Sequence, residues 1–217
     1  MNQKIIAEFF GTAFLLLVIV GSGITGETLS PGNEAIALLV NSVATGAGLF
    51  VLIQNIGPLS GAHFNPVVSL VEMFWGRLDR KNLAMYWLAQ FSGAILGVWL
   101  AHLIFNQTIF QISDKNRFGS HLWISETIAT FGLICTIALA GKKHVEFAPL
   151  TVASYVAAAY WFTSSTSFSN PAVTVARMLT DTFCGIAPNG VLAFIAAQIL
   201  GSLLAFLLLR RCTGLVR

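Results

Sequence analysis

Two stretches of the chain carry an Asn-Pro pair among mostly small, uncharged residues: Ser60-Gly61-Ala62-His63-Phe64-Asn65-Pro66-Val67 and Ser165-Thr166-Ser167-Phe168-Ser169-Asn170-Pro171-Ala172. Asn is a strong helix N-cap, because its side-chain oxygen accepts hydrogen bonds from the free N–H groups of the first turn. Proline is favoured at the first helical position, where its missing N–H would have no partner. Each pair therefore predicts the start of a helix. The first helical residues expected are Pro66 and Val67, and Pro171 and Ala172.

The composition predicts a protein that lies in a membrane. Of the 217 residues, 56% are hydrophobic and 10% are charged, and the mean hydropathy is +0.78. A soluble domain carries about 25% charged residues, and a helix that spans a bilayer needs about 20 mostly apolar ones. Six stretches meet that need: residues 4–24, 35–57, 82–106, 122–141, 147–168 and 188–210. The expected partners are lipid and small solutes, and a net charge of +3 does not suggest nucleic acid.

The basic residues predict the orientation of the chain in the membrane. On one expected side lie Lys4, Arg77, Arg80, Lys81, Lys142, Lys143, Arg210, Arg211 and Arg217, and on the other lie Lys115, Arg117 and Arg177. Cytoplasmic loops carry an excess of Lys and Arg, so both termini are expected in the cytoplasm. The chain is therefore expected to be a multi-pass protein of the plasma membrane, which in a bacterium is the inner membrane.

The second half of the chain repeats motifs of the first half in the same order. The matched motifs are Glu8 with Thr12 and Glu126 with Thr130, the two Asn-Pro pairs, and Gln90 with Gly93 and Gln198 with Gly201. They divide a single membrane domain, residues 1–217, into repeats 1–106 and 122–217 joined by an outer loop 107–121. Each repeat has three spans, an odd number, so the second repeat enters the membrane from the opposite side. Inverted repeats of this kind place a functional site near the membrane midplane.

The segments after the Asn-Pro pairs are too short to cross a membrane. Residues 66–76 and 171–180 each provide about 15 Å of helix, against a hydrocarbon core of about 30 Å. Two half-helices are expected to meet at the midplane, each with about half a positive charge at its start. The amide N–H groups of Asn65 and Asn170 would then donate into a pore, orient a passing water or alcohol and interrupt proton transfer. Such a pore needs no cofactor, metal or nucleophile, so no enzymatic activity is expected.

Together these motifs resemble those of the major intrinsic protein family, the aquaporins and aquaglyceroporins. The resemblance extends over essentially the whole chain. It implies six transmembrane helices plus two half-helices, a homotetramer with one pore per subunit, and passive flow in both directions.

The chain departs from the family at the narrow filter of the pore. Most members have Arg directly after the second Asn-Pro box, where this chain has Val173. Counting back from the boxes without gaps gives Thr45, Ala158 and Ser167 as the other filter positions. This uncharged set favours solutes larger than water, such as glycerol-like polyols or metalloid hydroxides. It resembles a bacterial subgroup linked to arsenic handling, which makes arsenous acid a candidate solute.

Arg177 has two interpretations. It lies four residues after Val173, so both side chains share one face of a helix, and its guanidinium can lean back toward the filter. Alternatively, Arg177 forms an ion pair with Asp181 that anchors the outer end of the half-helix.

Five further polar residues are expected to support the pore: Glu8, Glu126, His63, Gln90 and Gln198. A carboxylate inside the membrane is a functional candidate by default, but here each Glu is expected to accept backbone N–H groups of a neighbouring irregular loop. His63 is expected to anchor its loop, with gating by protonation as the alternative.

Two other functions remain open from the sequence. A secondary transporter also uses inverted repeats and broken helices, but it needs an ion or proton site at the break. No acidic pair lies in the sequence next to either Asn-Pro box. A non-conducting tetrameric scaffold is the third alternative.

Overall fold

The computed structural model describes residues 2–143 and 145–213, which form a bundle of helices without strands. In chain order the elements are α1 (Asn2–Leu29), α2 (Glu34–Ser60), α3 (Pro66–Phe74), α4 (Arg80–Ile104), α5 (Ser120–Lys143), the short 3-10 helix η1 (Val145–Phe147), α6 (Ala148–Phe162), α7 (Pro171–Arg177) and α8 (Pro188–Thr213). The order long, long, short, long occurs twice, in α1–α4 and in α5–α8. Of the basic residues used above to predict orientation, Arg217 lies outside the described residues.

Five helices of the described chain, α1, α2, α4, α5 and α8, are long and apolar enough to cross a membrane. The sixth predicted span, residues 147–168, is shorter than expected, because α6 has 15 residues and ends at Phe162. The chain after Phe162 is irregular, and three of its residues have positive φ angles: Thr166 at 60°, Ser167 at 48° and Ser169 at 48°. A helix cannot continue through such left-handed residues. The all-α architecture with two half-helices agrees with the prediction.

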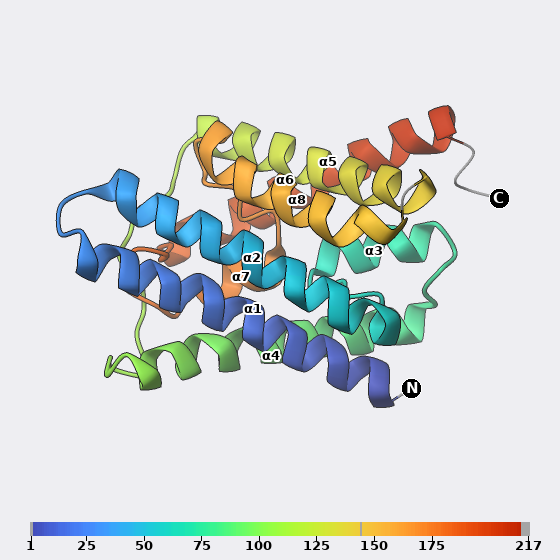
Figure 1. Cartoon of the computed structure of the whole chain (residues 1–217). Helices are drawn as coiled ribbons and strands as arrows, with labels where there is room; N and C mark the ends of the chain where they lie inside the picture. Colours follow the sequence, from blue (N-terminus) through green and yellow to red (C-terminus); the bar gives the residue numbers. More distant parts are fainter. Residues whose placement is uncertain (1, 144, 214–217) are drawn as a thin grey trace.

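The long helices enclose the two half-helices. Helix α1 packs against α2 and α4, α5 packs against α6 and α8, and α2 joins the two halves by packing against α6. Helices α3 and α7 contact each other inside the bundle (Figure 1). Helix α1 begins and α8 ends at the same end of the bundle (Figure 1).

Two glycines at matched positions allow close helix contacts. A Cβ atom added at Gly93 of α4 would lie 2.3 Å from the Phe9 carbonyl oxygen, and one at Gly201 of α8 would lie 2.3 Å from that of Thr127. Small residues let helices approach closely in lipid, where no hydrophobic force drives their association. These contacts explain why the Gln/Gly motif occurs once in each half.

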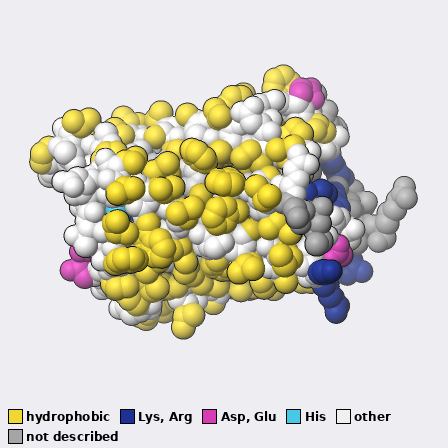
Figure 2. All heavy atoms as spheres, turned by 90° about the horizontal axis from the view of Figure 1, so that it is seen from below, with side chains coloured by type: hydrophobic (Ala, Val, Ile, Leu, Met, Phe, Trp, Pro, Cys, Tyr) yellow, Lys and Arg dark blue, Asp and Glu magenta, His cyan; other side chains and the backbone are white. Residues whose placement is uncertain are grey.

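The outer surface suits a lipid environment. Hydrophobic side chains cover the middle of the face shown in Figure 2, and Lys and Arg side chains gather at the end of the bundle where α1 begins. Exposed large hydrophobic residues occur on all the long helices, for example Phe14, Val43, Leu88, Ile128 and Leu207.

Candidate pore and its lining

The half-helices begin at the two Asn-Pro pairs. Asn65 Oδ1 accepts a hydrogen bond of 3.0 Å from the backbone N–H of Val67. Asn170 Oδ1 accepts bonds of 3.0 Å and 3.3 Å from Ala172 and Val173. Both Asn residues have extended backbones and are followed by proline at the first helical position. The side-chain oxygen of each Asn is therefore used in capping, as the sequence predicts.

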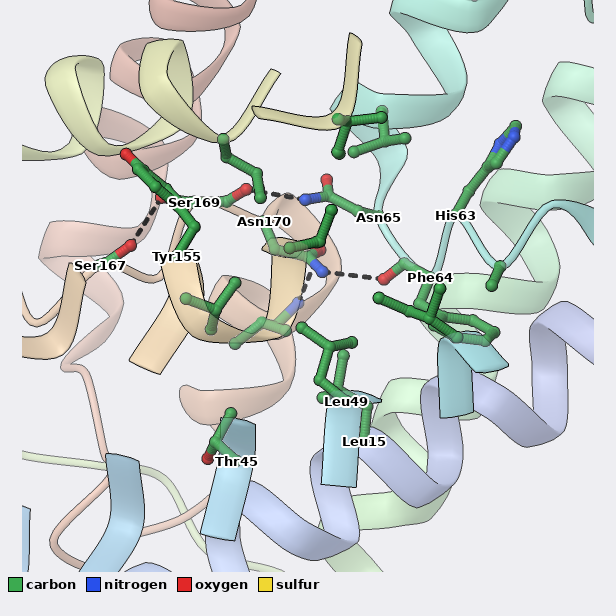
Figure 3. A pocket seen from close by; sticks show the side chains of 18 of the residues that line it. Leu15, Thr45, Leu49, His63, Phe64, Asn65, Tyr155, Ser167, Ser169 and Asn170 are labelled. Carbon is green, nitrogen blue, oxygen red and sulfur yellow. Dashed lines mark hydrogen bonds between the residues drawn. The ribbon is translucent and has the colours of Figure 1, made fainter. Parts of the chain in front are cut away.

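The two Asn side chains also connect the halves of the chain to each other. Asn65 Nδ2 donates to the Ser169 carbonyl and Asn170 Nδ2 donates to the Phe64 carbonyl, both at 2.8 Å (Figure 3). Phe64 and Ser169 have left-handed backbones, with φ of 47° and 48°, which non-glycine residues rarely adopt. The expectation that both N–H groups of each Asn amide are free to donate into the pore is therefore wrong. Each Asn donates one of its two Nδ2 N–H groups to a carbonyl of the opposite loop, which leaves the other N–H for a solute.

Glu8 holds the first irregular loop in place. Its Oε1 accepts from Ser60 Oγ at 2.7 Å and from the N–H of His63 at 2.9 Å. Its Oε2 accepts from the N–H of Phe64 at 2.7 Å and from Gln90 Nε2 at 2.8 Å. Glu8 is fully buried, and each buried N–H left without an acceptor would cost several kcal/mol in hydrocarbon.

Glu126 makes the same set of contacts in the second half. Its Oε1 accepts from Ser165 Oγ at 2.6 Å and from the N–H of Phe168 at 2.8 Å. Its Oε2 accepts from the N–H of Ser169 at 2.8 Å and from Gln198 Nε2 at 2.6 Å. The matching contacts give the matched sequence motifs a common structural role, which is to brace a loop beside a half-helix.

The glutamines and His63 extend these networks to the half-helices. Gln90 Nε2 also donates to Ser69 Oγ of α3, and Gln198 Nε2 to Thr174 Oγ1 of α7, each at 2.9 Å. His63 Nδ1 lies 2.9 Å from Ser69 Oγ. The geometry favours the anchoring interpretation of His63, although its side chain also lines the cavity described next.

One cavity of about 320 Å³ passes both Asn residues. Its polar lining includes Asn65, Asn170, Ser167 and Thr45, and other residues of the two irregular loops also line it (Figure 3). Aliphatic lining residues come from four of the long helices: Leu15, Ile19, Leu49, Ile53, Leu133, Ile137, Val152 and Val156. The cavity therefore has polar and apolar walls.

Three of the four predicted filter residues, Thr45, Ser167 and Val173, line this cavity, and Ala158 does not. Ala158 is exposed on the outside of α6, and Tyr160 takes its place, with its hydroxyl donating to Thr45 Oγ1 at 3.3 Å. Two residues along a helix turn by about 200°, so Ala158 and Tyr160 face nearly opposite directions. The gap-free count failed because it crossed the irregular chain after Phe162.

Helix periodicity would have identified Tyr160. Val152, Val156 and Tyr160 are spaced four residues apart, and all three line the cavity. That spacing places side chains on one face of a helix. The four-residue spacing in the sequence thus predicts Tyr160, whereas the count from the second Asn-Pro pair predicted Ala158.

Arg177 also lines the cavity, although only 2% of its surface is exposed. Its Nε donates to the Cys184 carbonyl, and its Cζ lies 3.4 Å from the centre of the Phe168 ring. The alternative ion pair with Asp181 is not formed, because α7 ends at Arg177 and the i,i+4 relation is lost. Asp181 instead accepts from the N–H of Asp114 at 3.2 Å.

A second arginine packs against Phe168 from the loop before α5. Arg117 Nε donates to the Gly185 carbonyl at 2.9 Å, and its Cζ lies 5.2 Å from the Phe168 ring centre. Burial, with repulsion from Arg177 as a smaller cause, lowers the pKa of Arg117 to about 10. Arg117 does not line the cavity.

The described residues contain no group of three or more His, Cys, Asp or Glu side chains placed to hold a metal ion.

Two Asn-capped half-helices that meet inside an apolar bundle, beside one cavity, define a membrane channel.

Comparisons with known proteins identify the family. A model of the family described as "Major intrinsic protein" matches residues 1–169. The chain is 48% identical over 210 residues to aquaglyceroporin AqpS of Rhizobium meliloti (strain 1021), which covers 97% of this chain and 90% of that protein. It is 31% identical over 196 residues to aquaporin NIP2-3 of Zea mays, which covers 86% of this chain and 63% of the maize protein. The chain belongs to the major intrinsic protein family and is a passive channel, not an enzyme.

The fold is also that of a solved structure. The X-ray structure of the aquaglyceroporin from Plasmodium falciparum matches with a TM-score of 0.76 at 19% identity, over 99% of this chain and 98% of that one. At this identity the match supports the fold alone.

Proposed function

We propose that this channel conducts small uncharged solutes, including water and glycerol-like polyols, through the cavity between the two halves of the chain. One observation carries this proposal: beside the second Asn-Pro pair the cavity is lined by hydroxyl groups and by the aliphatic Val173, with no charged side chain directly after the pair. The name of the Rhizobium relative, an aquaglyceroporin, agrees with this choice of solute.

The two walls of the cavity match the two sides of a polyol. Hydroxyl groups of Thr45, Tyr160 and Ser167 can donate to and accept from the hydroxyls of a solute. Aliphatic residues, among them Val173 and Val156, can contact its carbon skeleton. A few placed polar groups in a mostly apolar cavity are typical of a small-molecule site.

The paired Asn residues are proposed to orient each solute at the centre of the pore. The remaining N–H of Asn65 and that of Asn170 donate to the same passing oxygen, and the positive ends of α3 and α7 disfavour cations there. This arrangement supports conduction of neutral solutes without protons.

Arsenous acid is a further candidate solute. It is an uncharged trihydroxide at neutral pH, so its hydroxyls can use the same Thr45, Tyr160 and Ser167 groups as a polyol. The presence of Val173 in place of Arg, as in the arsenic-linked subgroup that the sequence resembles, supports its inclusion in the flux assay.

We further propose that the chain forms a homotetramer in the plasma membrane, with inverted repeats and both termini in the cytoplasm. The gathering of Lys and Arg side chains at the end where α1 begins supports this orientation (Figure 2). Native mass spectrometry of detergent-solubilised protein tests the oligomeric state, and protease accessibility of terminal tags in sealed vesicles tests the orientation.

Stopped-flow measurements on proteoliposomes test the function. We expect flux of water, glycerol and arsenous acid that rises linearly with concentration, and much slower flux of sorbitol. Flux that saturates and depends on an ion gradient would indicate a transporter instead. Flux equal to that of protein-free vesicles would indicate a non-conducting scaffold.

A further inference from the structure

Among the residues that the structure describes, Arg177 is a buried charge without a charged partner. The side chain is 2% exposed, and no carboxylate within the described residues forms an ion pair with it. Charged side chains are almost never fully buried unless they are paired. Here the compensation comes from the Cys184 carbonyl and from the face of the Phe168 ring, where the Arg177 Cζ lies 3.4 Å from the ring centre.

Within the described residues, most of the hydrogen-bonding capacity of Arg177 is not used. A guanidinium has five N–H donors, and the structure gives one acceptor for them among the described residues, the Cys184 carbonyl. Arg177 lines the cavity, so an oxygen of a solute or water in the cavity can accept from the remaining donors. The neighbouring cation Arg117 packs on the same Phe168 ring, with its Cζ 5.2 Å from the ring centre, but it does not line the cavity.

The position of Arg177 along the pore follows from helix geometry. Arg177 is the last residue of α7, one turn and about 6 Å beyond Val173 along the axis. It lies toward the end of the bundle where α1 terminates, because neighbouring Phe183 donates its N–H to Glu27 of α1 at 3.2 Å. Val173 and the positive charge of Arg177 therefore lie at different levels along the cavity.

We propose that Arg177 is a second barrier to cations, in addition to the positive ends of α3 and α7, and that it binds solute oxygens one helical turn beyond Val173. This proposal rests on the channel function proposed above and assigns part of its charge selectivity to a named side chain. A pore with the uncharged Val173 beside the second Asn-Pro pair can then admit polyols, while the fixed guanidinium of Arg177, in a site of low dielectric constant, repels cations of the same size.

The test compares Arg177→Gln with wild type in proteoliposomes, with potassium ions and glycerol as the two probes. Gln retains an amide donor for the Cys184 carbonyl but removes the charge. We expect potassium flux to rise roughly tenfold or more, because removal of a unit charge this close to the path changes the barrier by that order. Glycerol flux is expected to fall, because a donor to solute oxygens is lost, but to stay above that of protein-free vesicles, and this remaining flux would show that the variant is folded.

Lys115→Gln is the matched control. Lys115 also donates to a backbone carbonyl, that of Phe183 at 3.1 Å, and also packs on a phenylalanine ring, but it does not line the cavity. We expect no rise in potassium flux in this variant.

Arg177→Lys provides a second test that does not depend on the Gln variant folding. A buried lysine loses its charge at or below about pH 10, whereas arginine keeps its charge. We expect the Lys variant to exclude potassium at pH 7 and to admit it as the pH approaches 10, while wild type stays closed to potassium. Variants that conduct glycerol and exclude potassium as well as wild type at both pH values would overturn the proposal. Absence of glycerol flux in wild type would instead contradict the proposed function.

Discussion

Asn65 Nδ2 donates a hydrogen bond of 2.8 Å to the carbonyl oxygen of Ser169, a residue 104 positions later in the chain. Asn170 and Phe64 form the reciprocal bond at the same distance. Each Asn therefore caps its own half-helix with its oxygen and holds the opposite loop with its nitrogen. The two halves of the channel are joined where the proposed path is most polar.

Replacing Asn65 with Asp separates these two roles. Asp keeps an oxygen to cap α3 but presents a carboxylate oxygen to the Ser169 carbonyl, which loses its donor. A buried group left unsatisfied costs about 1–3 kcal/mol, so the free energy of unfolding should fall by that order. The negative charge also offsets the positive helix ends, so we expect proton flux through proteoliposomes to increase.

Asn55→Asp is the control for this substitution. Asn55 is exposed on α2 and bonds within its own helix, to the Val51 carbonyl at 2.8 Å. Its replacement should change neither proton flux nor thermal stability measurably. Equal proton flux in Asn65→Asp and wild type would show that the central Asn does not govern proton exclusion.

Replacing Glu126 with Gln should destabilise the second loop. Gln has one carbonyl oxygen where Glu126 accepts from four donors, including the N–H groups of Phe168 and Ser169. The loss of charge-assisted bonds to buried donors is expected to cost about 2–3 kcal/mol. Thermal unfolding in detergent measures this, and Glu34→Gln at the exposed start of α2 should have a much smaller effect. Equal effects of the two substitutions would contradict the bracing role.

Replacing Gly93 or Gly201 with Ala should push two helices apart. The added Cβ would lie 2.3 Å from a backbone carbonyl oxygen in both cases, so the backbone must shift. Overpacking of this kind costs about 1–3 kcal/mol. Gly57→Ala is the matched control in a helix, because nothing lies within 4 Å of its added Cβ. The midpoint temperature of thermal unfolding should be clearly lower for Gly93→Ala and Gly201→Ala than for Gly57→Ala.

The Asp79 cap of α4 predicts a pH dependence of stability. Hydrogen bonds from the Asn82 backbone N–H at 2.8 Å and from its side chain at 2.6 Å hold the pKa of Asp79 below its ordinary value of 3.8. A lowered folded-state pKa means that the stabilisation is present above the unfolded-state pKa and is lost as the pH falls through the folded-state value. Asp79→Asn keeps a capping oxygen that does not titrate. Lowering the pH below about 4 should therefore destabilise wild type more than Asp79→Asn. Thermal unfolding of both proteins at a series of pH values measures this difference.

Local rules predicted the half-helices and their braces, and failed where the backbone is irregular. Asn capping and proline at the first helical position depend on adjacent residues, so Asn65 and Asn170 could be placed from the sequence. The gap-free count that gave Ala158 was wrong because it crossed the irregular chain after Phe162. The Arg177–Asp181 pair, one of the two interpretations of Arg177, was wrong because it required a helix that continues past Arg177. The bonds between Asn65 and Ser169 and between Asn170 and Phe64 depend on how the halves pack, which no local pattern reports.

The most direct test of the account is the ratio of glycerol flux to water flux in Val173→Phe, measured in proteoliposomes beside Ala158→Phe. Val173 lines the cavity and Ala158 lies outside it, so the same added ring should narrow the pore only at residue 173. We expect glycerol flux to fall roughly tenfold or more in Val173→Phe with a smaller loss of water flux, and both to stay at wild-type values in Ala158→Phe. An unchanged ratio in Val173→Phe, or an equal loss in both variants, would contradict a wide neutral filter at Val173.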